Sequence, residues 1–462
     1  MINYFNFKRF DDKFLITNDF GSYAFISPDT LRAMVIGDRE IPQTVCDELT
    51  EKGFLVDNSV HSFAENMVEE MRNSKSYLFQ ATGLHIFVLT NQCNHACLYC
   101  QASASNTKKN FMSGETAEYA VRAALSSRNP NLSFEFQGGE PLLNFDTIRR
   151  IVEYTEEIKG DRNVTYSIVT NLTLITEEMV RFFIDHNVSI STSLDGPKEL
   201  HDMNRPLFNG KPSYDKVVDS IKRIQDRGVG VGAIQTTTKF SLRYPEEIAD
   251  EYDRLGLGSL FVRPLTPLGA AGRIWDQIGY TAEEFCSFYA KVLDHVIRMA
   301  RNGRHIQENH AAIFLSKILH GYGLNYMELR SPCGAGFGQM AYYPDGEIFT
   351  CDEGRMVYET GDSSFRIGNV YDGNNAQMVQ TPVCTACARA SCLEAIPGCS
   401  DCVYQPYCGV CPVINLALDG DIISRQPNSW RCRIYSGMLD ALFRVLKQND
   451  PETYRILSSW RS

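Results

Sequence analysis

The sequence lacks any apolar segment long enough to enter or cross a membrane. Residues 1–9 contain no apolar core of signal-peptide length. Apolar stretches such as residues 86–89 are far shorter than the roughly 20 residues that span a bilayer. With neither an export signal nor a span, we expect a cytoplasmic protein that does not bind membranes.

Basic residues are also scarce. Lys and Arg number 45 against 56 Asp and Glu, which gives a formal net charge of −11. No Lys/Arg cluster with interleaved aromatic residues is present, and an extended phosphate-tracking surface needs many basic side chains. We therefore expect no nucleic-acid partner. The sequence also has no low-complexity tract and no internal repeat, and its 44% hydrophobic fraction is typical of a globular protein.

Cysteine, by contrast, is abundant. The 462 residues include 15 cysteines, and in a long chain without a signal peptide these indicate metal or redox chemistry more often than disulfides. Three lie at Cys93, Cys97 and Cys100, and ten lie between Cys333 and Cys432. Cys46 and Cys286 stand alone, and we assign them no role.

Residues 1–84 read as a small domain of three short strands followed by helices. Runs rich in aromatic and branched residues at 4–10, 13–17 and 22–26 are separated by turn signals. One helix is expected to begin after Ser27-Pro28, and another covers about residues 42–52.

Residues 85–305 alternate between strand and helix patterns. This alternation predicts an α/β domain with a parallel sheet, either open or curled into a partial barrel, whose ligands bind at the carboxyl ends of the strands. The expected strands are 85–90, 132–137, 164–170, 189–194, 229–236 and 260–265. The expected helices are 113–127, 145–159, 176–186, 214–227, 245–255 and 281–301.

The C-terminal third is rich in Gly, Pro and Cys. Regular structure is expected to fade between about residues 330 and 412, and a final docking helix is expected at 435–447. We divide this part into a bridging segment, 306–330, a cysteine-rich domain, 331–448, and a C-terminal tail, 449–462.

The three cysteines on the loop after the first strand are the first candidate site. Cys93, Cys97 and Cys100 are spaced to hold three irons of a four-iron cluster, which leaves one iron open for catalysis. A structural zinc site, with His95 as the fourth ligand, is the alternative.

Polar groups follow the later strands at the same edge of the expected sheet. Gly138 and Gly139 expose backbone groups and Glu140 adds an acceptor, which suits a bound ammonium group, although an ordinary strand-to-helix turn is the alternative. Hydroxyl, amide and guanidinium groups further on could bind a carboxylate and a ribose; they belong to Thr170, Asn171, Ser191, Ser193 and Arg205.

Residues 85 to about 300 resemble the radical S-adenosylmethionine (SAM) superfamily. The resemblance is carried by the Cys-x3-Cys-x2-Cys spacing, by Tyr99 before the last cysteine and by Gly138-Gly139-Glu140-Pro141. It implies a partial (β/α)6 barrel in which the three cysteines hold a 4Fe–4S cluster, SAM chelates the open iron, and Gly138 to Glu140 bind its amino group. Tyr99 and the polar residues after later strands complete the SAM site. A 5′-deoxyadenosyl radical then abstracts a substrate hydrogen.

The later cysteines resemble the SPASM extension of radical SAM enzymes that act on peptides and proteins. Cys333, Gly346 and Cys351 have the expected spacing Cys-x12-Gly-x4-Cys. The later cysteines depart from the pattern, because two residues separate Cys408 from Cys411 where the pattern has three. By position, Cys399, Cys402, Cys408 and Cys432 resemble the ligands of an outer auxiliary cluster. Cys333, Cys351 and Cys411 resemble three ligands of an inner one, which would bring the total to three 4Fe–4S clusters.

Cys384, Cys387 and Cys392 are additional to that pattern. One of them could complete the inner cluster, or they could bind a separate zinc or stay free, and their spacing does not decide. Zinc in place of both auxiliary clusters also remains open.

Asp352 directly follows Cys351. In sulfatase-maturating relatives an aspartate after the corresponding cysteine deprotonates the substrate side chain, so the resemblance makes Asp352 a candidate general base. A solvated turn aspartate is the alternative.

The N-terminal unit resembles the winged-helix peptide-recognition domains of peptide-maturing enzymes, which bind a leader peptide by strand addition. We therefore expect a maturase of ribosomally made precursor peptides, similar to those of His-Xaa-Ser-type systems, that installs a cross-link or related modification. A ferredoxin or flavodoxin would supply electrons. The alternatives are a sulfatase-type maturase that forms formylglycine and a non-enzymatic iron–sulfur electron carrier; Gly138-Gly139-Glu140 argues against the carrier.

Overall fold

A ten-stranded sheet organises the molecule. The structure, a computed structural model, describes residues 1–56, 60–321, 327–373 and 375–460. Six successive parallel strands form the middle of the sheet in chain order, as the sequence predicts. They are β4 (Leu84–Val88), β5 (Asn131–Gln137), β6 (Asn163–Val169), β7 (Val188–Ser193), β8 (Val231–Thr236) and β9 (Ser259–Arg263).

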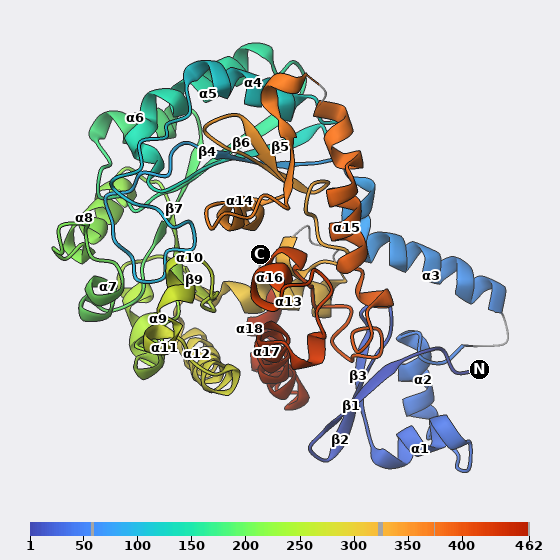
Figure 1. Cartoon of the computed structure of the whole chain (residues 1–462). Helices are drawn as coiled ribbons and strands as arrows, with labels where there is room; N and C mark the ends of the chain where they lie inside the picture. The colour runs from blue at the N-terminus through green and yellow to red at the C-terminus, as the bar shows by residue number, and fades with distance from the viewer. Residues whose placement is uncertain (57–59, 322–326, 374, 461–462) are drawn as a thin grey trace.

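Amphipathic helices cover the outer face of these strands. In α5, for example, Ile148, Ile151 and Val152 are fully buried, because residues three and four apart share one helix face. Figure 1 shows the helices in an arc outside the strands, so the domain is a partial barrel, as expected. They are α4 (Gly114–Leu125), α5 (Phe145–Ile158), α6 (Glu177–Asp185), α7 (Lys198–Asn204), α8 (Tyr214–Gln225), α9 (Pro245–Arg254) and α12 (Ala282–Arg301), with the short α10 (Gly269–Arg273) and α11 (Trp275–Ile278) before α12.

A short strand and a helix close one edge of the barrel. Strand β10 (Gln307–Glu308) pairs with β9, and α13 (Asn309–His320) follows it at once. The buried Glu308 carboxylate accepts hydrogen bonds from the backbone of Val262, His310 and Ala311 and from the Tyr289 hydroxyl. Burial raises the pKa of Glu308 to about 7 despite these donors.

The cysteine-rich segment contains more regular structure than its composition predicts. Strand β11 (Gln339–Tyr342) pairs in parallel with β4, and β12 (Glu347–Phe349) and β13 (Arg366–Asn369) continue the sheet as antiparallel strands. All four residues of β11 are buried, so no polar–apolar alternation marks it. Three helices lie among these strands and cysteines: α14 (Asp352–Tyr358), α15 (Pro382–Ala390) and α16 (Pro412–Asp419).

The C-terminal helices dock on the barrel. The predicted final helix is α17 (Trp430–Lys447), which packs along α12. The segment expected as a tail contains a further helix, α18 (Pro451–Ser459), whose Leu457 is fully buried and whose preceding Asp450 pairs with Arg301 at 2.8 Å.

The N-terminal unit has the expected order of three strands followed by helices. Antiparallel strands β1 (Asn6–Phe10), β2 (Lys13–Thr17) and β3 (Tyr23–Ile26) precede α1 (Pro28–Ile36), α2 (Gln43–Glu51) and a third helix that the sequence did not indicate, α3 (Val60–Ser74). The unit lies beside the C-terminal helices (Figure 1). It is held there by a hydrogen bond from Thr17 Oγ1 to the Val403 carbonyl, 2.7 Å, and by the Lys8–Asp440 ion pair, 2.7 Å. None of the helices in the described residues is long and apolar enough to cross a membrane.

Candidate functional site

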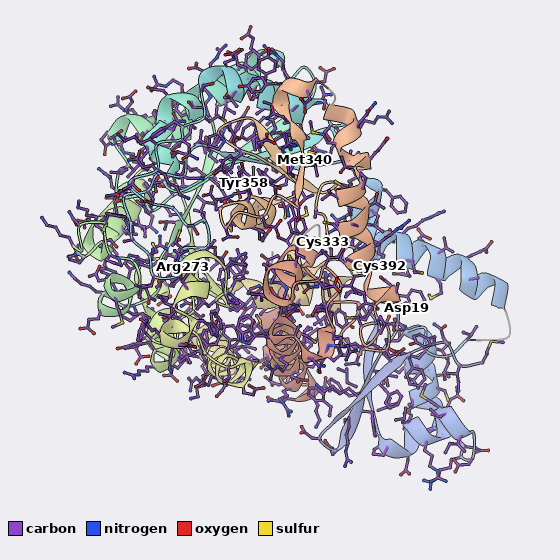
Figure 2. All side chains as sticks on the ribbon, in the orientation of Figure 1. Asp19, Arg273, Cys333, Met340, Tyr358 and Cys392 are labelled. Atoms are coloured by element: carbon purple, nitrogen blue, oxygen red, sulfur yellow. The ribbon has the colours of Figure 1, made fainter. Side chains whose placement is uncertain are left out.

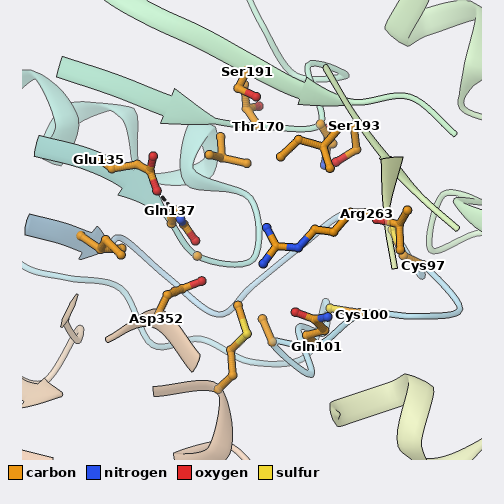
Figure 3. A pocket seen from close by; sticks show the side chains of 18 of the residues that line it. Cys97, Cys100, Gln101, Glu135, Gln137, Thr170, Ser191, Ser193, Arg263 and Asp352 are labelled. Carbon is orange, nitrogen blue, oxygen red and sulfur yellow. Dashed lines mark hydrogen bonds between the residues drawn. The ribbon is translucent and has the colours of Figure 1, made fainter. Parts of the chain in front are cut away.

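A cavity of about 600 Å³ opens at the carboxyl ends of the barrel strands. This volume lies within the roughly 300–1,000 Å³ typical of small-molecule sites. The loop after β4, the ends of β5 to β9 and helix α14 all contribute side chains to its wall. In Figure 3, Cys97 and Cys100 lie on one side of the cavity, Asp352 and Gln137 lie on the other, and Arg263 extends between them.

The three cysteines of the first motif line this cavity together. Backbone N–H groups of His95 and Ala104 point at the sulfurs of Cys93 and Cys100, each at 3.4 Å. Burial raises the pKa of Cys97 to about 11 and that of Cys93 further still. These thiols are therefore neutral on their own, and a metal that displaces their protons would make them ligands.

His95 is buried beside the cysteines, and among the described residues its Nδ1 has no hydrogen-bond partner. Its Nε2 lies 3.4 Å from Thr173 Oγ1, and burial lowers its pKa to about 3. Across the described ranges, no three His, Cys, Asp or Glu side chains converge closely enough to hold one metal ion. The ligands of a four-iron cluster bind different irons and do not need to converge on one atom, so the cysteine triad fits a cluster better than a closed zinc site.

Gly138 and Gly139 are required by a close approach of two backbones. A Cβ on Gly138 would lie 2.3 Å from the Thr90 carbonyl oxygen, and one on Gly139 would lie 2.3 Å from that of Gln92. The same closeness allows Gly139 N–H to bind the Thr90 carbonyl at 2.7 Å. The two glycines therefore fix the start of the cysteine loop against the end of β5, and both line the cavity.

Glu140 is held by hydrogen bonds to the loops around it. Its carboxylate is fully buried and accepts hydrogen bonds from Thr170 Oγ1 at 2.7 Å, Asn171 N–H at 2.8 Å and Leu142 N–H at 3.0 Å. These are ordinary bond lengths, and they occupy three of the roughly four lone-pair positions of a carboxylate. Glu140 thus positions the loop after β6 behind the cavity wall.

The remaining SAM-site candidates are brought together as predicted by their positions on the strands. Thr170, Asn171, Ser191, Ser193 and Arg205 all line the cavity. Arg205 Nη1 donates to the Tyr99 hydroxyl at 2.7 Å, and that hydroxyl donates to the fully buried Asp195 at 2.9 Å. Burial raises the pKa of Asp195 to about 6, against the opposing effect of Arg205. Asp195 was not singled out in the sequence.

The wall opposite the cysteines is formed by the first turn of α14. The Cys351 sulfur caps this helix by accepting the Gly354 N–H at 3.3 Å, which places Asp352 at its first position and on the cavity. Arg355 Nε donates to Asp352 Oδ1 at 2.7 Å. Asp352 is therefore not a solvated turn residue, because it faces the cavity in an ion pair.

A charged network crosses the floor of the cavity. Arg263, from the end of β9, pairs with Glu328, and Glu328 lies 3.6 Å from the guanidinium of Arg431. Burial raises the pKa of the neighbouring Glu353 to about 7, with Glu328 adding to the shift. Sequence reasoning missed these residues because each lies outside a motif, in a segment that only the fold brings to the cavity.

The auxiliary cysteines fall into two groups. Cys333, Cys351, Cys387 and Cys411 pack in one buried cluster, so Cys387 joins the three predicted inner cysteines. Figure 2 places Cys333 near the centre of the molecule. Hydrogen bonds from Ser391 Oγ to the Cys387 carbonyl, 2.6 Å, and from Cys333 N–H to Ser391 Oγ, 2.9 Å, tie α15 to this cluster.

The second group is the predicted outer one. Burial raises the pKa of Cys399 to about 12, and the neighbouring thiols of Cys408, Cys432 and Cys402 add to the shift. Cys384 and Cys392 lie apart: the Cys384 thiol donates to the Met378 carbonyl at 3.4 Å, and the Cys392 thiol to Glu394 at 3.4 Å. Four neighbouring thiols, as in each of these two groups, suit a fully ligated cluster.

Comparison with characterised sequences agrees with this chemistry. The model of the Radical SAM superfamily matches residues 87–257. A cysteine-type anaerobic sulfatase-maturating enzyme of Clostridium novyi is 27% identical over 69% of this chain and 84% of its own length. The radical SAM cyclopropyl synthase TigE of Paramaledivibacter caminithermalis is 24% identical over 73% of this chain and 69% of its own. An uncharacterised protein of Methanocaldococcus jannaschii is 34% identical, but the match spans 39% of this chain and 62% of that relative.

Solved structures show the same fold. A structure of anSMEcpe with bound AdoMet and Cp18Cys peptide has a TM-score of 0.68 at 20% identity and covers 81% of this chain and 99% of that one. Streptococcus suis SuiB bound to precursor peptide SuiA has a TM-score of 0.56 at 14% identity and covers 91% of this chain and 97% of that one. With its cysteine loop, partial barrel and sequence relatives, residues 87–257 of this chain form a radical SAM domain, the domain of enzymes whose cofactors are SAM and 4Fe–4S clusters.

Proposed function

We propose that this enzyme modifies a side chain of a ribosomally made precursor peptide. The observation that carries the proposal is an N-terminal three-stranded domain joined to a radical SAM barrel with two auxiliary cysteine groups. SuiB, which binds a precursor peptide, covers 91% of this chain, whereas anSMEcpe covers 81% although its TM-score is higher. The broader coverage supports a precursor peptide as substrate.

Residues on the two sides of the cavity would have different roles. Cys93, Cys97 and Cys100 would hold the catalytic cluster, and the backbone of Gly138 and Gly139 would bind the SAM amino group. The polar groups at the ends of β6 and β7, with Arg205 held by Tyr99, would bind the rest of SAM. When bound, the cluster and SAM supply a 5′-deoxyadenosyl radical that abstracts a substrate hydrogen.

On the opposite side, Asp352 would accept a proton from the substrate. Its ion pair with Arg355 aims the carboxylate across the cavity. A carboxylate in this position can accept a proton once the substrate side chain becomes more acidic during the reaction.

The two auxiliary groups would each hold a 4Fe–4S cluster. We assign Cys333, Cys351, Cys387 and Cys411 to the inner cluster and Cys399, Cys402, Cys408 and Cys432 to the outer one. The closeness of the four thiols within each group supports this assignment, because a bound metal offsets the charge of neighbouring thiolates. Cys384 and Cys392 would stay free.

The N-terminal domain would recognise the leader part of the peptide. Its sheet ends in two edge strands, β1 and β3, and an edge strand can pair with an added peptide strand. The domain contacts the segment that carries the outer cysteines: Asn6 Nδ2 donates to the Cys402 carbonyl at 3.2 Å. A leader bound there would tether the rest of the peptide close to the barrel.

A ferredoxin or flavodoxin would supply the electron that starts the reaction. We propose a cytoplasmic setting for the enzyme, where thiols are kept reduced.

A sulfatase-type maturase is the second candidate function. Two observations favour it: the sulfatase-maturating relative from Clostridium novyi is matched over 84% of its length, and Asp352 faces the cavity. This enzyme would act on a cysteine or serine of a sulfatase peptide and would not need a leader.

Anaerobic co-expression with the short peptides encoded beside the gene separates these functions. We expect one peptide to change mass, and we expect no change with a Cys93→Ala/Cys97→Ala/Cys100→Ala variant. Formylglycine in a sulfatase-derived peptide, with every neighbouring peptide unmodified, would favour the second function. If reduced enzyme and SAM gave no 5′-deoxyadenosine with either kind of peptide, both functions would be wrong.

A further inference from the structure

The buried cation Arg431 lies beside both auxiliary cysteine groups. Arg431 is the second residue of α17 and directly precedes Cys432 of the outer group. Only 9% of the residue is exposed, and its guanidinium lies over the Tyr435 ring, 4.6 Å from the ring centre. Burial of a charge is costly, so an arginine is expected here only where negative groups surround it.

The backbone places this guanidinium against the link between the two groups. Arg431 Nη2 approaches the Glu328 carbonyl oxygen at 3.5 Å. Gly409, between Cys408 of the outer group and Cys411 of the inner one, packs against the same carbonyl, where a Cβ would lie 2.4 Å away. Arg431 is thus beside the short segment that joins one cysteine group to the other.

The charge of Arg431 is only partly balanced by protein groups. Glu328 lies 3.6 Å away, but it also pairs with Arg263. Among the residues that the structure describes, Nε of Arg431 is buried without a hydrogen-bond partner. Although burial opposes the charged form, Tyr435, Glu328, Cys411 and Cys408 raise the pKa of Arg431 above its usual range. A donor that is buried and unpaired in this way is suited to a negatively charged sulfur cluster.

We propose that Arg431 is a positioning residue that sets the reduction potentials of both auxiliary clusters. This inference rests on the proposed function, which places clusters at the two cysteine groups. Reduction adds one negative charge to a cluster, and a fixed cation nearby in a medium of low dielectric constant stabilises the reduced form. Arg431 therefore raises both potentials. Glu328, the carboxylate between Arg431 and the cavity, lowers them.

The test is an anaerobic redox titration of the reconstituted full chain, followed by electron paramagnetic resonance. Cys93→Ala/Cys97→Ala/Cys100→Ala is used as the background so that only auxiliary clusters give a signal. Arg431→Gln is expected to shift both midpoint potentials to more negative values, and Arg431→Lys to shift them less. Glu328→Gln is expected to shift them in the positive direction.

Arg444→Gln is the matched control. Arg444 lies in the last turn of the same helix, half exposed and 3.1 Å from Asp11, so its replacement should leave both potentials unchanged. Arg431→Gln with full iron content and unchanged potentials would overturn the inference. If Arg431→Gln loses iron, the other two variants decide. The inference would be overturned if Arg431→Lys and Glu328→Gln had the same midpoint potentials as the parent. Zinc without sulfide in the parent chain would contradict the cluster assignment itself.

Discussion

Arg355 Nε donates a hydrogen bond to Asp352 Oδ1 at 2.7 Å, one turn earlier in α14. The Arg355 side chain is 1% exposed, and its Nη2 also approaches Gln137 at the end of β5, at 3.4 Å. A single buried guanidinium therefore connects the candidate base to the strand that carries Gly138 and Gly139. Helix α14 and the end of β5, which lie on the same side of the cavity, are held together by this contact.

Replacing Asp352 with Asn should abolish peptide modification while SAM cleavage continues. The amide oxygen can still accept from Arg355, so α14 should keep its place, but an amide cannot accept the substrate proton. We expect product to fall by at least about a hundredfold, the lower end of the usual contribution of a general base. Liquid chromatography of 5′-deoxyadenosine and mass spectrometry of the peptide measure the two steps.

Asp345→Asn provides the comparison for that experiment. Asp345 lies in the exposed turn between β11 and β12 and accepts from Glu347 N–H, which asparagine also permits. It should behave like the parent. Equal loss of SAM cleavage and product in Asp352→Asn would show a structural role for Asp352.

Gly139→Ala should disrupt the catalytic cysteine loop. The new Cβ would lie 2.3 Å from the Gln92 carbonyl oxygen, and Gln92 directly precedes Cys93. We expect at least about a tenfold fall in 5′-deoxyadenosine formation, equivalent to about 1.4 kcal/mol. Gly230→Ala, whose Cβ would meet nothing within 4 Å, should have little effect. Similar rates for both variants would mean that the loop moves freely.

Cys387→Ser should remove one auxiliary cluster, or make it labile, because Cys387 packs with Cys333, Cys351 and Cys411. The loss would be up to about four irons and four sulfides per chain. Cys384→Ser, one turn earlier in α15, should keep full iron, since the Cys384 thiol donates to the Met378 carbonyl. Iron and acid-labile sulfide analysis measures both variants. The assignment fails if Cys384→Ser loses iron and Cys387→Ser does not.

Glu308 should make the protein less stable as pH rises from about 4.5 to 7. Burial raises its folded pKa from 4.5 to about 7, so in this window the folded state binds more protons than the unfolded state. The free energy of unfolding falls by about 3 kcal/mol across this window, and the fall is complete once pH exceeds the folded pKa of Glu308.

Denaturant unfolding of the apoprotein at several pH values tests this expectation. Glu308→Gln should flatten the pH dependence in that window, whereas Glu283→Gln, 70% exposed at its side chain, should not. An identical slope in the parent and in Glu308→Gln would show that other groups cause it.

The sequence alone determined the barrel and the catalytic loop because both depend on local patterns. Amphipathic helices between apolar strands specify consecutive parallel pairing, and β4 to β9 pair in chain order as predicted. Cys93, Cys97 and Cys100 lie within one short loop, so their spacing already keeps their thiols close together. The chain order of strand ends likewise brought Thr170, Ser191 and Arg205 to one cavity.

Only the tertiary structure decided which distant groups meet. Strand β11 joins β4 through backbone hydrogen bonds that leave no periodic mark in a fully buried segment, and this pairing brings α14 with Asp352 and Arg355 to the cavity. Cys387 and Arg431 reach the auxiliary groups by helix packing, which residue spacing does not encode. Glu140 belongs to a sequence motif, but the motif does not show which groups its carboxylate contacts. The fold shows that the carboxylate accepts hydrogen bonds from Thr170 and Asn171.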